Sequence, residues 1–171
     1  KYENTGKFLG AYWWSHAIIS LDWYRYAEWD LTLRNKLAQK SKKTFLIYCR
    51  EQSGTRQYRG EFLAKIKKLM MHCQTESFCN ENISSDSSAT YDSYDYCATD
   101  FSVILETVFD DRVHLTEKTL RAIACGHPFW LLAGPKSLEY LRRYNFKTFS
   151  PYIDESYDNI QDKDKRMDAV V

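Results

Sequence analysis

Residues 101–124 read FSVILETVFDDRVHLTEKTLRAIA, and this stretch decides the fold. Its first part, 101–105, is a short apolar run of the kind that forms a buried strand. The paired aspartates at 110–111 indicate a turn, because aspartate favours turns through its own side-chain hydrogen bonds. Thr116 then suits the N-cap of a helix that ends at Gly126. A strand that leads through a loop into a helix is the repeating unit of α/β proteins.

The same alternation continues on both sides of this unit. We predict further strands at 44–49, 127–132 and 147–149, and further helices at 22–39, 58–73, 137–144 and in the acidic tail after Asp154. Residues 74–99 are rich in Ser, Asn, Asp and Tyr, so they predict a long loop with room for one short strand. The pattern as a whole predicts a Rossmann-like α/β fold, in which a mostly parallel open sheet carries helices on both faces.

The length of the chain limits the number of domains. Its 171 residues, of which 44% are hydrophobic, fit one domain with a continuous core and leave no room for a second full domain. We divide the chain into an aromatic-rich N-terminal helical segment, 1–40, and the Rossmann-like domain, 41–171. The tryptophans of 1–40 favour an interface with a missing domain or a second subunit. The chain begins at Lys1 without a Met, which suggests that an upstream part is absent.

Charge and cysteine content narrow the class of protein. The net charge of +1 argues against strong whole-molecule attraction to nucleic acid or to an anionic membrane. The charge is segregated, because 34–68 is mostly basic whereas 81–111 contains acids and neither Lys nor Arg. The five cysteines form no Cys-x-x-Cys pair, so we expect reduced thiols and a cytoplasmic protein. No apolar run approaches the about 20 residues of a membrane span, and no signal peptide is recognisable.

The loop after the first predicted strand is a candidate anion site. It carries Arg50, Arg56 and Arg59, and it leads into a helix whose first N–H groups are unpaired. Arginine forks beside a helix N-terminus suit a diphosphate, although solvated loop arginines would give the same pattern. The sequence contains neither G-x-G-x-x-G nor a P-loop, so it supports neither a nicotinamide dinucleotide site nor a P-loop nucleotide site.

A second candidate site follows the strand at 101–105. Glu106 comes directly after that strand, and Glu117 and Lys118 stand at the start of the next helix. A carboxylate can accept hydrogen bonds from ribose hydroxyls, and an ammonium group can neutralise a phosphate oxygen. A helix cap with its dipole partner would also account for Glu117 but leaves Glu106 and Lys118 unexplained.

Several of these pieces together resemble a known family. The relevant runs are Phe101-Ser102-Val103-Ile104-Leu105-Glu106-Thr107, Leu115-Thr116-Glu117-Lys118-Thr119, Gly126-His127-Pro128-Phe129, Gly134, and upstream Arg59-Gly60-Glu61-Phe62-Leu63. Their order and spacing resemble the C-terminal donor-binding domain of fucosyltransferase-type glycosyltransferases, which have the two-domain GT-B fold. The similarity spans roughly 44–134. The runs 146–149 and 154–158 resemble a variant of this domain in bacterial and phage-like glycosyltransferases.

The resemblance implies a role for each candidate residue. Arg59 and Lys118, together with Arg56, would hold the diphosphate of a nucleotide-sugar donor, and Glu117 would bind the nucleotide ribose. Three further residues would contact the ribose or base: Glu106, Thr107 and His114. At two of these positions the sequence departs from the family, because Thr107 replaces an Asn and His114 replaces a Tyr. The contacts to the base or the sugar are therefore expected to differ.

The resemblance also implies a reaction. A hydroxyl of a glycan or another acceptor would attack the anomeric carbon in an inverting transfer while the diphosphate leaves. The general base of this family lies in the other, N-terminal domain, so we assign no catalytic residue here, and His16 and His114 are candidates only by their ordinary pKa. We expect no metal ion and no cofactor, and we interpret the aspartates at 110–111 as a turn and not as a metal motif.

Two other functions are compatible with the sequence. One is a non-catalytic module that binds nucleic acid or a nucleotide, in which Lys65, Lys67 and Lys68 would contact phosphates and Tyr48 would stack on a base. The other is a truncated transferase that binds its donor without turnover. The absence of an evident general base is consistent with this second alternative.

Overall fold

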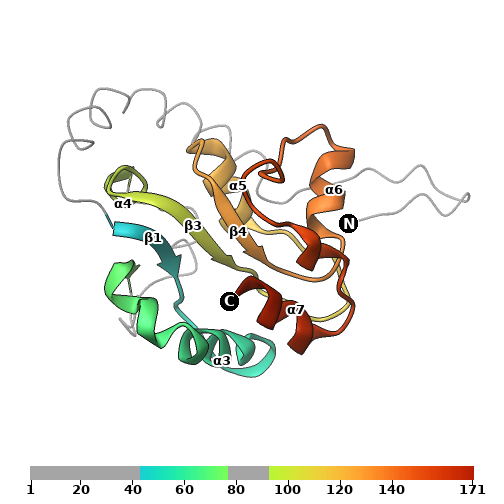
Figure 1. Cartoon of the computed structure of the whole chain (residues 1–171), viewed down its shortest axis with the longest axis horizontal. Helices are drawn as coiled ribbons and strands as arrows, with labels where there is room; N and C mark the ends of the chain where they lie inside the picture. The colour runs from blue at the N-terminus through green and yellow to red at the C-terminus, as the bar shows by residue number, and fades with distance from the viewer. Residues whose placement is uncertain (1–42, 77–92) are drawn as a thin grey trace, which may run out of the picture.

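The computed structural model describes residues 43–76 and 93–171, and these residues form an α/β structure around one parallel sheet (Figure 1). The strands are β1 (Lys43–Tyr48), β2 (Cys73–Glu76), β3 (Thr99–Leu105) and β4 (Phe129–Leu132). The α-helices are α3 (Tyr58–Lys65), α4 (Ser93–Cys97), α5 (Glu117–Ala124), α6 (Ser137–Arg143) and α7 (Lys163–Val170). Within these described ranges the 3-10 helices are η1 (Gly54–Arg56), η2 (Lys67–His72) and η4 (Ser156–Asn159).

The order of the strands creates a switch point at the centre of the sheet. The four strands lie in the order β2-β1-β3-β4, and every neighbouring pair is parallel. From β1 the chain continues to β2 on one side, whereas from β3 it continues to β4 on the other. The two loops that leave the carboxyl ends of β1 and β3 therefore diverge. In open α/β sheets this divergence makes the crevice in which ligands bind.

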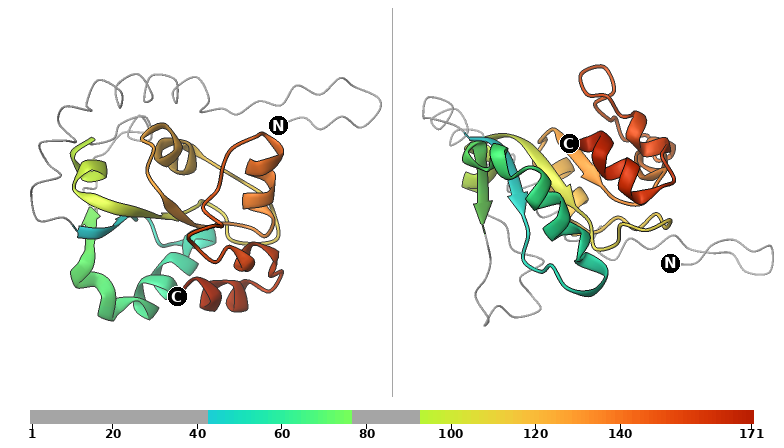
Figure 2. Two further views of the ribbon diagram at one scale, coloured as in Figure 1. Left: turned by 45° about the horizontal axis from the view of Figure 1, so that its top comes forward. Right: turned by 60° about the horizontal axis from the view of Figure 1, so that its bottom comes forward.

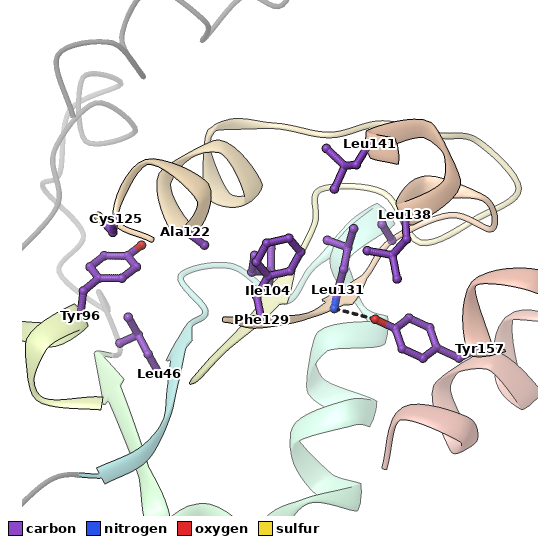
Figure 3. Close-up of a cluster of buried hydrophobic side chains, with 11 residues drawn as sticks. Leu46, Tyr96, Ile104, Ala122, Cys125, Phe129, Leu131, Leu138, Leu141 and Tyr157 are labelled. Carbon is purple, nitrogen blue, oxygen red and sulfur yellow. Dashed lines mark hydrogen bonds between the residues drawn. The ribbon is translucent and has the colours of Figure 1, made fainter. Parts of the chain in front are cut away.

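Helices cover both faces of the sheet (Figures 1 and 2). Alternate strand residues point to opposite faces, so Leu46 belongs to one core cluster and Ile47 to the other. The first cluster packs β1, β3 and β4 against α5 and α6, and Figure 3 shows its side chains. The second cluster packs the opposite face against α3 and α7 through residues such as Phe62 and Met167. This arrangement explains why the strands read as continuous apolar runs.

The C-terminal segment is held by hydrogen bonds to the backbone around β4 and at the start of α6. Arg166 of α7 is only 1% exposed, and its guanidinium donates to the carbonyls of Ala133 (3.1 Å) and Asp110 (3.1 Å). The carboxylate of Asp158 accepts hydrogen bonds from two backbone N–H groups at the start of α6, those of residues 138 and 139, each at 2.9 Å. Asp158 thus caps a helix from a different part of the chain.

The structure confirms the predicted open parallel sheet with helices on both faces, and it corrects several elements. The helix predicted at 58–73 ends at Lys65 and continues as η2 and β2, because apolar residues three apart fit a 3-10 helix as well as an α-helix. The strand predicted at 147–149 is irregular, since the Phe149 N–H donates to the Glu155 carboxylate (2.7 Å) and not to a neighbouring strand. The short strand allowed within 74–99 is present as most of β2, and the same stretch also contains α4, which was not predicted. The helix predicted at 22–39 lies outside the described residues.

A close backbone contact leads to a testable prediction. A Cβ atom added to Gly134 would lie 2.0 Å from the carbonyl oxygen of Arg112, so Gly134→Ala must displace backbone. We expect this variant to lose at least about 2 kcal/mol of unfolding free energy in urea denaturation. Gly60→Ala is the matched control. Gly60 lies within helix α3, and a Cβ atom added there would meet only the end of the Gln52 side chain. That change should be neutral or stabilising by up to about 1 kcal/mol, and equal losses in both variants would contradict the prediction.

Candidate functional site

The candidate site lies at the switch point between β1 and β3. The loop from β1 to α3 and the loop from β3 to α5 both start at the carboxyl ends of these strands. A hydrogen bond from the Thr55 hydroxyl to the carbonyl of Thr107 (3.5 Å) joins the two loops. The predicted residues Arg56, Thr107 and Lys118 all belong to these loops or to the helix start that follows them. The structure thus brings together, at the carboxyl ends of β1 and β3, two segments that are far apart in the sequence.

Glu106 is the most buried member of the site. Its side chain is 0% exposed, and its carboxylate accepts hydrogen bonds from the Thr116 N–H (2.9 Å), the Thr116 hydroxyl (2.5 Å) and the Thr119 hydroxyl (2.6 Å). The N–H of Thr107 adds a longer contact of 3.3 Å. Glu106 therefore fastens the first turn of α5 to the end of β3. Its oxygens face these protein donors, so it positions the site and does not offer a free carboxylate to a ribose.

Arg59 is also buried, with only 3% of its surface exposed. Its Nη2 donates to the carbonyls of Leu105 (2.9 Å) and Glu106 (3.0 Å), and its Nη1 donates to the carbonyl of Glu51 (2.9 Å). The neighbouring Tyr58 hydroxyl donates to the Glu106 carbonyl at 2.5 Å. In this arrangement Arg59 contacts backbone carbonyls from both loops. These contacts give Arg59 a positioning role between the two loops, and its direct contact with a diphosphate stays a prediction.

Glu117 and Lys118 form an ion pair at the start of α5. The Lys118 ammonium lies 2.6 Å from the Glu117 carboxylate and 3.2 Å from the Thr116 hydroxyl. The two side chains keep 24% and 12% of their surface exposed for Lys118 and Glu117, respectively. Through Thr116 the ammonium is connected to the carboxylate of Glu106. Lys118 is therefore held in place but remains in reach of a ligand at the helix start.

The other predicted residues lie nearer the surface. Arg56 pairs with Glu51 at 2.6 Å, and because both side chains are well exposed this pair adds little stability and can exchange for another anion. Thr107 is half-buried, whereas His114 is exposed on the loop that precedes α5. Arg56 and His114 are thus accessible at the surface and take no part in the core.

Sequence reasoning missed Arg121, which lies one helical turn after Lys118 on α5. Both residues, together with Tyr48, line a cavity of about 20 Å³, which has room for a single water molecule. The Arg121 guanidinium lies 5.7 Å from the centre of the Tyr48 ring, and the Tyr48 hydroxyl donates to the buried carboxylate of Asp95 at 2.6 Å. Burial and Asp95 hold the pKa of Tyr48 far above its ordinary value. Lys118 and Arg121 are three residues apart, and this spacing could have indicated that both cations lie on the same face of the predicted helix.

The aspartates at 110–111 form a turn. Asp110 accepts hydrogen bonds from the backbone N–H of Arg112 (2.9 Å) and from its guanidinium Nε, and the pKa of Asp110 is lowered chiefly by that guanidinium.

Among residues 43–76 and 93–171 no group of His, Cys, Asp or Glu is arranged to hold a metal ion. Over the same ranges no helix has both the length and the apolar character to cross a membrane.

Comparison with known proteins adds no relative: no protein-family model matches the chain, and no curated protein or solved structure is significantly similar to it. Any function must therefore be argued from the geometry of the site and from the resemblance of its short motifs.

The role of Glu106 is testable by substitution. Glu106→Ala leaves the N–H and hydroxyl of Thr116 and the hydroxyl of Thr119 without their acceptor, so we expect a loss of about 3 kcal/mol or more in unfolding free energy. Glu106→Gln keeps one acceptor oxygen and should lose less. Glu61→Ala, at an exposed position of α3, is the control and should change stability by less than about 1 kcal/mol. Urea denaturation measures all three, and a Glu106→Ala variant as stable as the control would refute the role.

Proposed function

We propose that this chain is the nucleotide-sugar-binding domain of a glycosyltransferase, one half of a GT-B architecture. It would transfer a sugar from a nucleoside diphosphate to a glycan or another hydroxyl acceptor, by an inverting and metal-independent reaction. The observation that carries the proposal is the position of Lys118, which is partly exposed at the start of α5, beside the switch point of a parallel sheet. Ligands of open α/β sheets bind at this place.

The ion pair of Lys118 and Glu117 suggests how a nucleoside diphosphate would bind. A diphosphate oxygen that approaches the ammonium would compete with the Glu117 carboxylate, which lies 2.6 Å away. Glu117 would then be released to accept hydrogen bonds from the ribose hydroxyls. One ligand would thus satisfy both partners of the pair.

Local charge determines which other residues the site needs. Glu106 and Glu117 together place two negative charges beside Lys118, so Lys118 alone would not attract a diphosphate. The β1–α3 loop supplies the missing positive charge through Arg56 and the exposed Arg50. A diphosphate in the crevice would therefore be held from both loops, and Arg59 would act by keeping the two loops together.

The reaction needs a base that the described residues do not supply. His127 is buried, and its ring contacts the Ser102 hydroxyl (2.8 Å) and the Thr99 carbonyl (3.1 Å), which makes it a structural histidine. His114 is exposed on a loop, and His16 lies outside the described residues. We therefore assign the base to another domain or subunit, and Lys118 would stabilise the charge of the leaving diphosphate.

Two further observations bear on the proposal. The alternative of a nucleic-acid-binding module would use Lys65, which pairs with Asp168 at 2.6 Å in an exposed ion pair that another anion can replace. The Tyr48 ring, which would have to stack on a base, lies between Arg121 and Tyr96.

A thermal-shift screen with GDP, UDP, CDP and ADP tests the proposed site. A ligand that binds only the native state raises its melting temperature, so a shift with one diphosphate would identify the nucleotide. In Lys118→Ala we expect binding to weaken by about 2 kcal/mol, or roughly 30-fold, because a charge-assisted contact is lost. The control is Lys147→Ala, an exposed lysine on the loop after α6, which should bind as the unmodified chain does.

Other outcomes distinguish the alternatives. Equal affinity in Lys118→Ala and Lys147→Ala would contradict the proposed site. Oligonucleotide binding that falls steeply with added salt, without any diphosphate binding, would favour the nucleic-acid module. Diphosphate binding without turnover, even when candidate partner domains are added, would favour a transferase that has lost its activity.

A further inference from the structure

Arg166 of helix α7 binds the backbone of three separate segments. Its Nε donates to the carbonyl of Ala133 at the end of β4 (3.1 Å). Its Nη1 donates to the carbonyl of Ile160, shortly before α7 (2.7 Å). Its Nη2 donates to the carbonyl of Asp110 (3.1 Å) and, at 3.5 Å, to that of Phe109, and both carbonyls belong to the loop from β3 to α5. Each nitrogen of the guanidinium thus binds a different segment.

The Phe109 ring adds a second contact between α7 and this loop. The guanidinium carbon of Arg166 lies 4.5 Å from the centre of that ring, which is within the range of a cation–π contact. The same ring stacks on Tyr58 of α3, with 4.5 Å between the ring centres and 21° between the planes. The Tyr58 hydroxyl in turn donates to the carbonyl of Glu106 at 2.5 Å. Phe109 therefore links α7 to α3, and both helices lie on the same face of the sheet (Figures 1 and 2).

The loop from β3 to α5 depends on contacts with other segments, because residues 107–116 form neither helix nor strand. Its two ends are joined by the carboxylate of Glu106, which accepts hydrogen bonds from the N–H and hydroxyl of Thr116. Its middle is held by Arg166, which is only 1% exposed. Lys118 follows this loop in the first turn of α5, and its ammonium contacts the Thr116 hydroxyl. The position of that ammonium therefore depends on the arrangement of the whole loop.

We propose that Arg166 is a positioning residue of the candidate site, which acts on a bound diphosphate through the loop from β3 to α5. The inference rests on the proposed function, because it takes the Lys118 ammonium as the group that meets the diphosphate. Without the guanidinium, the carbonyls of 109–110 lose their donor and the loop gains other arrangements. A ligand that binds one arrangement loses affinity in proportion to the fraction of molecules that adopt it. Lysine cannot replace Arg166, since a single ammonium nitrogen cannot bind three segments as a planar fork does.

Arg166→Lys tests the proposal, with Leu141→Ala as the control. Leu141 is 0% exposed in the other core cluster, so Leu141→Ala lowers stability without removing any hydrogen bond that holds the loop. Affinity is measured by titration calorimetry with whichever of GDP, UDP, CDP and ADP stabilises the unmodified chain, at a temperature at which both variants are folded. In Arg166→Lys we expect roughly 10-fold weaker binding, as for a loop in the binding arrangement about a tenth of the time. In Leu141→Ala the affinity should stay within about twofold of the unmodified chain, because distant sites act independently.

Amide hydrogen exchange provides a readout that needs no ligand. In Arg166→Lys the amides of 107–115 should exchange faster relative to those of β3 and β4, because the loop opens without the sheet. In Leu141→Ala that ratio should stay as it is in the unmodified chain. Equal ratios in the two variants, or equal diphosphate affinities, would overturn the positioning role of Arg166.

These measurements separate the inference from the proposed function. If the unmodified chain binds none of the four diphosphates, the proposed function fails, and the role of Arg166 in donor binding fails with it. If the unmodified chain binds one that Arg166→Lys binds equally well, only the role of Arg166 fails.

A second variant replaces Arg166→Lys if that variant does not fold. Phe109→Leu keeps the guanidinium and removes the ring that contacts both Arg166 and Tyr58. We expect it to show the same faster exchange of 107–115 and the same direction of change in diphosphate affinity. Unchanged exchange and unchanged affinity in Phe109→Leu would overturn the proposal.

Discussion

The carboxylate of Glu106 connects the sheet with the helix that starts the candidate site. The two carboxylate oxygens accept hydrogen bonds from the backbone N–H and hydroxyl of Thr116 and from the hydroxyl of Thr119. The backbone carbonyl of Glu106 accepts hydrogen bonds from the side chains of Tyr58 and Arg59. One residue at the end of β3 thereby fixes the start of α5 and the start of α3. Because both helices begin at the switch point, the relative position of the two loops there depends on this single buried carboxylate. A buried charge of this kind is tolerated only when its hydrogen bonds are complete.

Local sequence patterns predicted the central part of the fold well. The strand at 101–105, the helix that ends at Gly126, and the helix within 137–144 are all present, and Gly126 adopts the positive φ of 60° that favours glycine at this position. Thr116 also stands at the predicted N-cap. Its hydroxyl, however, donates to Glu106 and makes no capping bond within its own helix. Periodicity and capping preferences are properties of short segments, so they could be recognised without knowledge of the fold.

The partners of the arginines could not be predicted in this way. Arg59 and Arg166 both bind backbone carbonyls that lie far away in the sequence, and both are almost completely buried. An arginine that binds a carbonyl and one that binds a phosphate look the same in a sequence, since the same N–H groups serve both. Loops that leave parallel strands in different directions leave carbonyls without strand partners, and buried arginines satisfy these groups. The structure thereby separates the positioning arginine from Arg56 and Lys118, which remain accessible.

The hydrogen bond between Tyr157 and β4 has a consequence for the behaviour of the chain in solution. β4 is an outer strand, and its Leu131 N–H donates to the Tyr157 hydroxyl at 3.2 Å (Figure 3). An outer strand with unpaired N–H groups is a template on which another polypeptide can add a strand. The segment that follows α6 therefore occupies part of this strand edge and disfavours self-association there. Loss of this contact would leave the Leu131 N–H at the outer edge of the sheet without that partner.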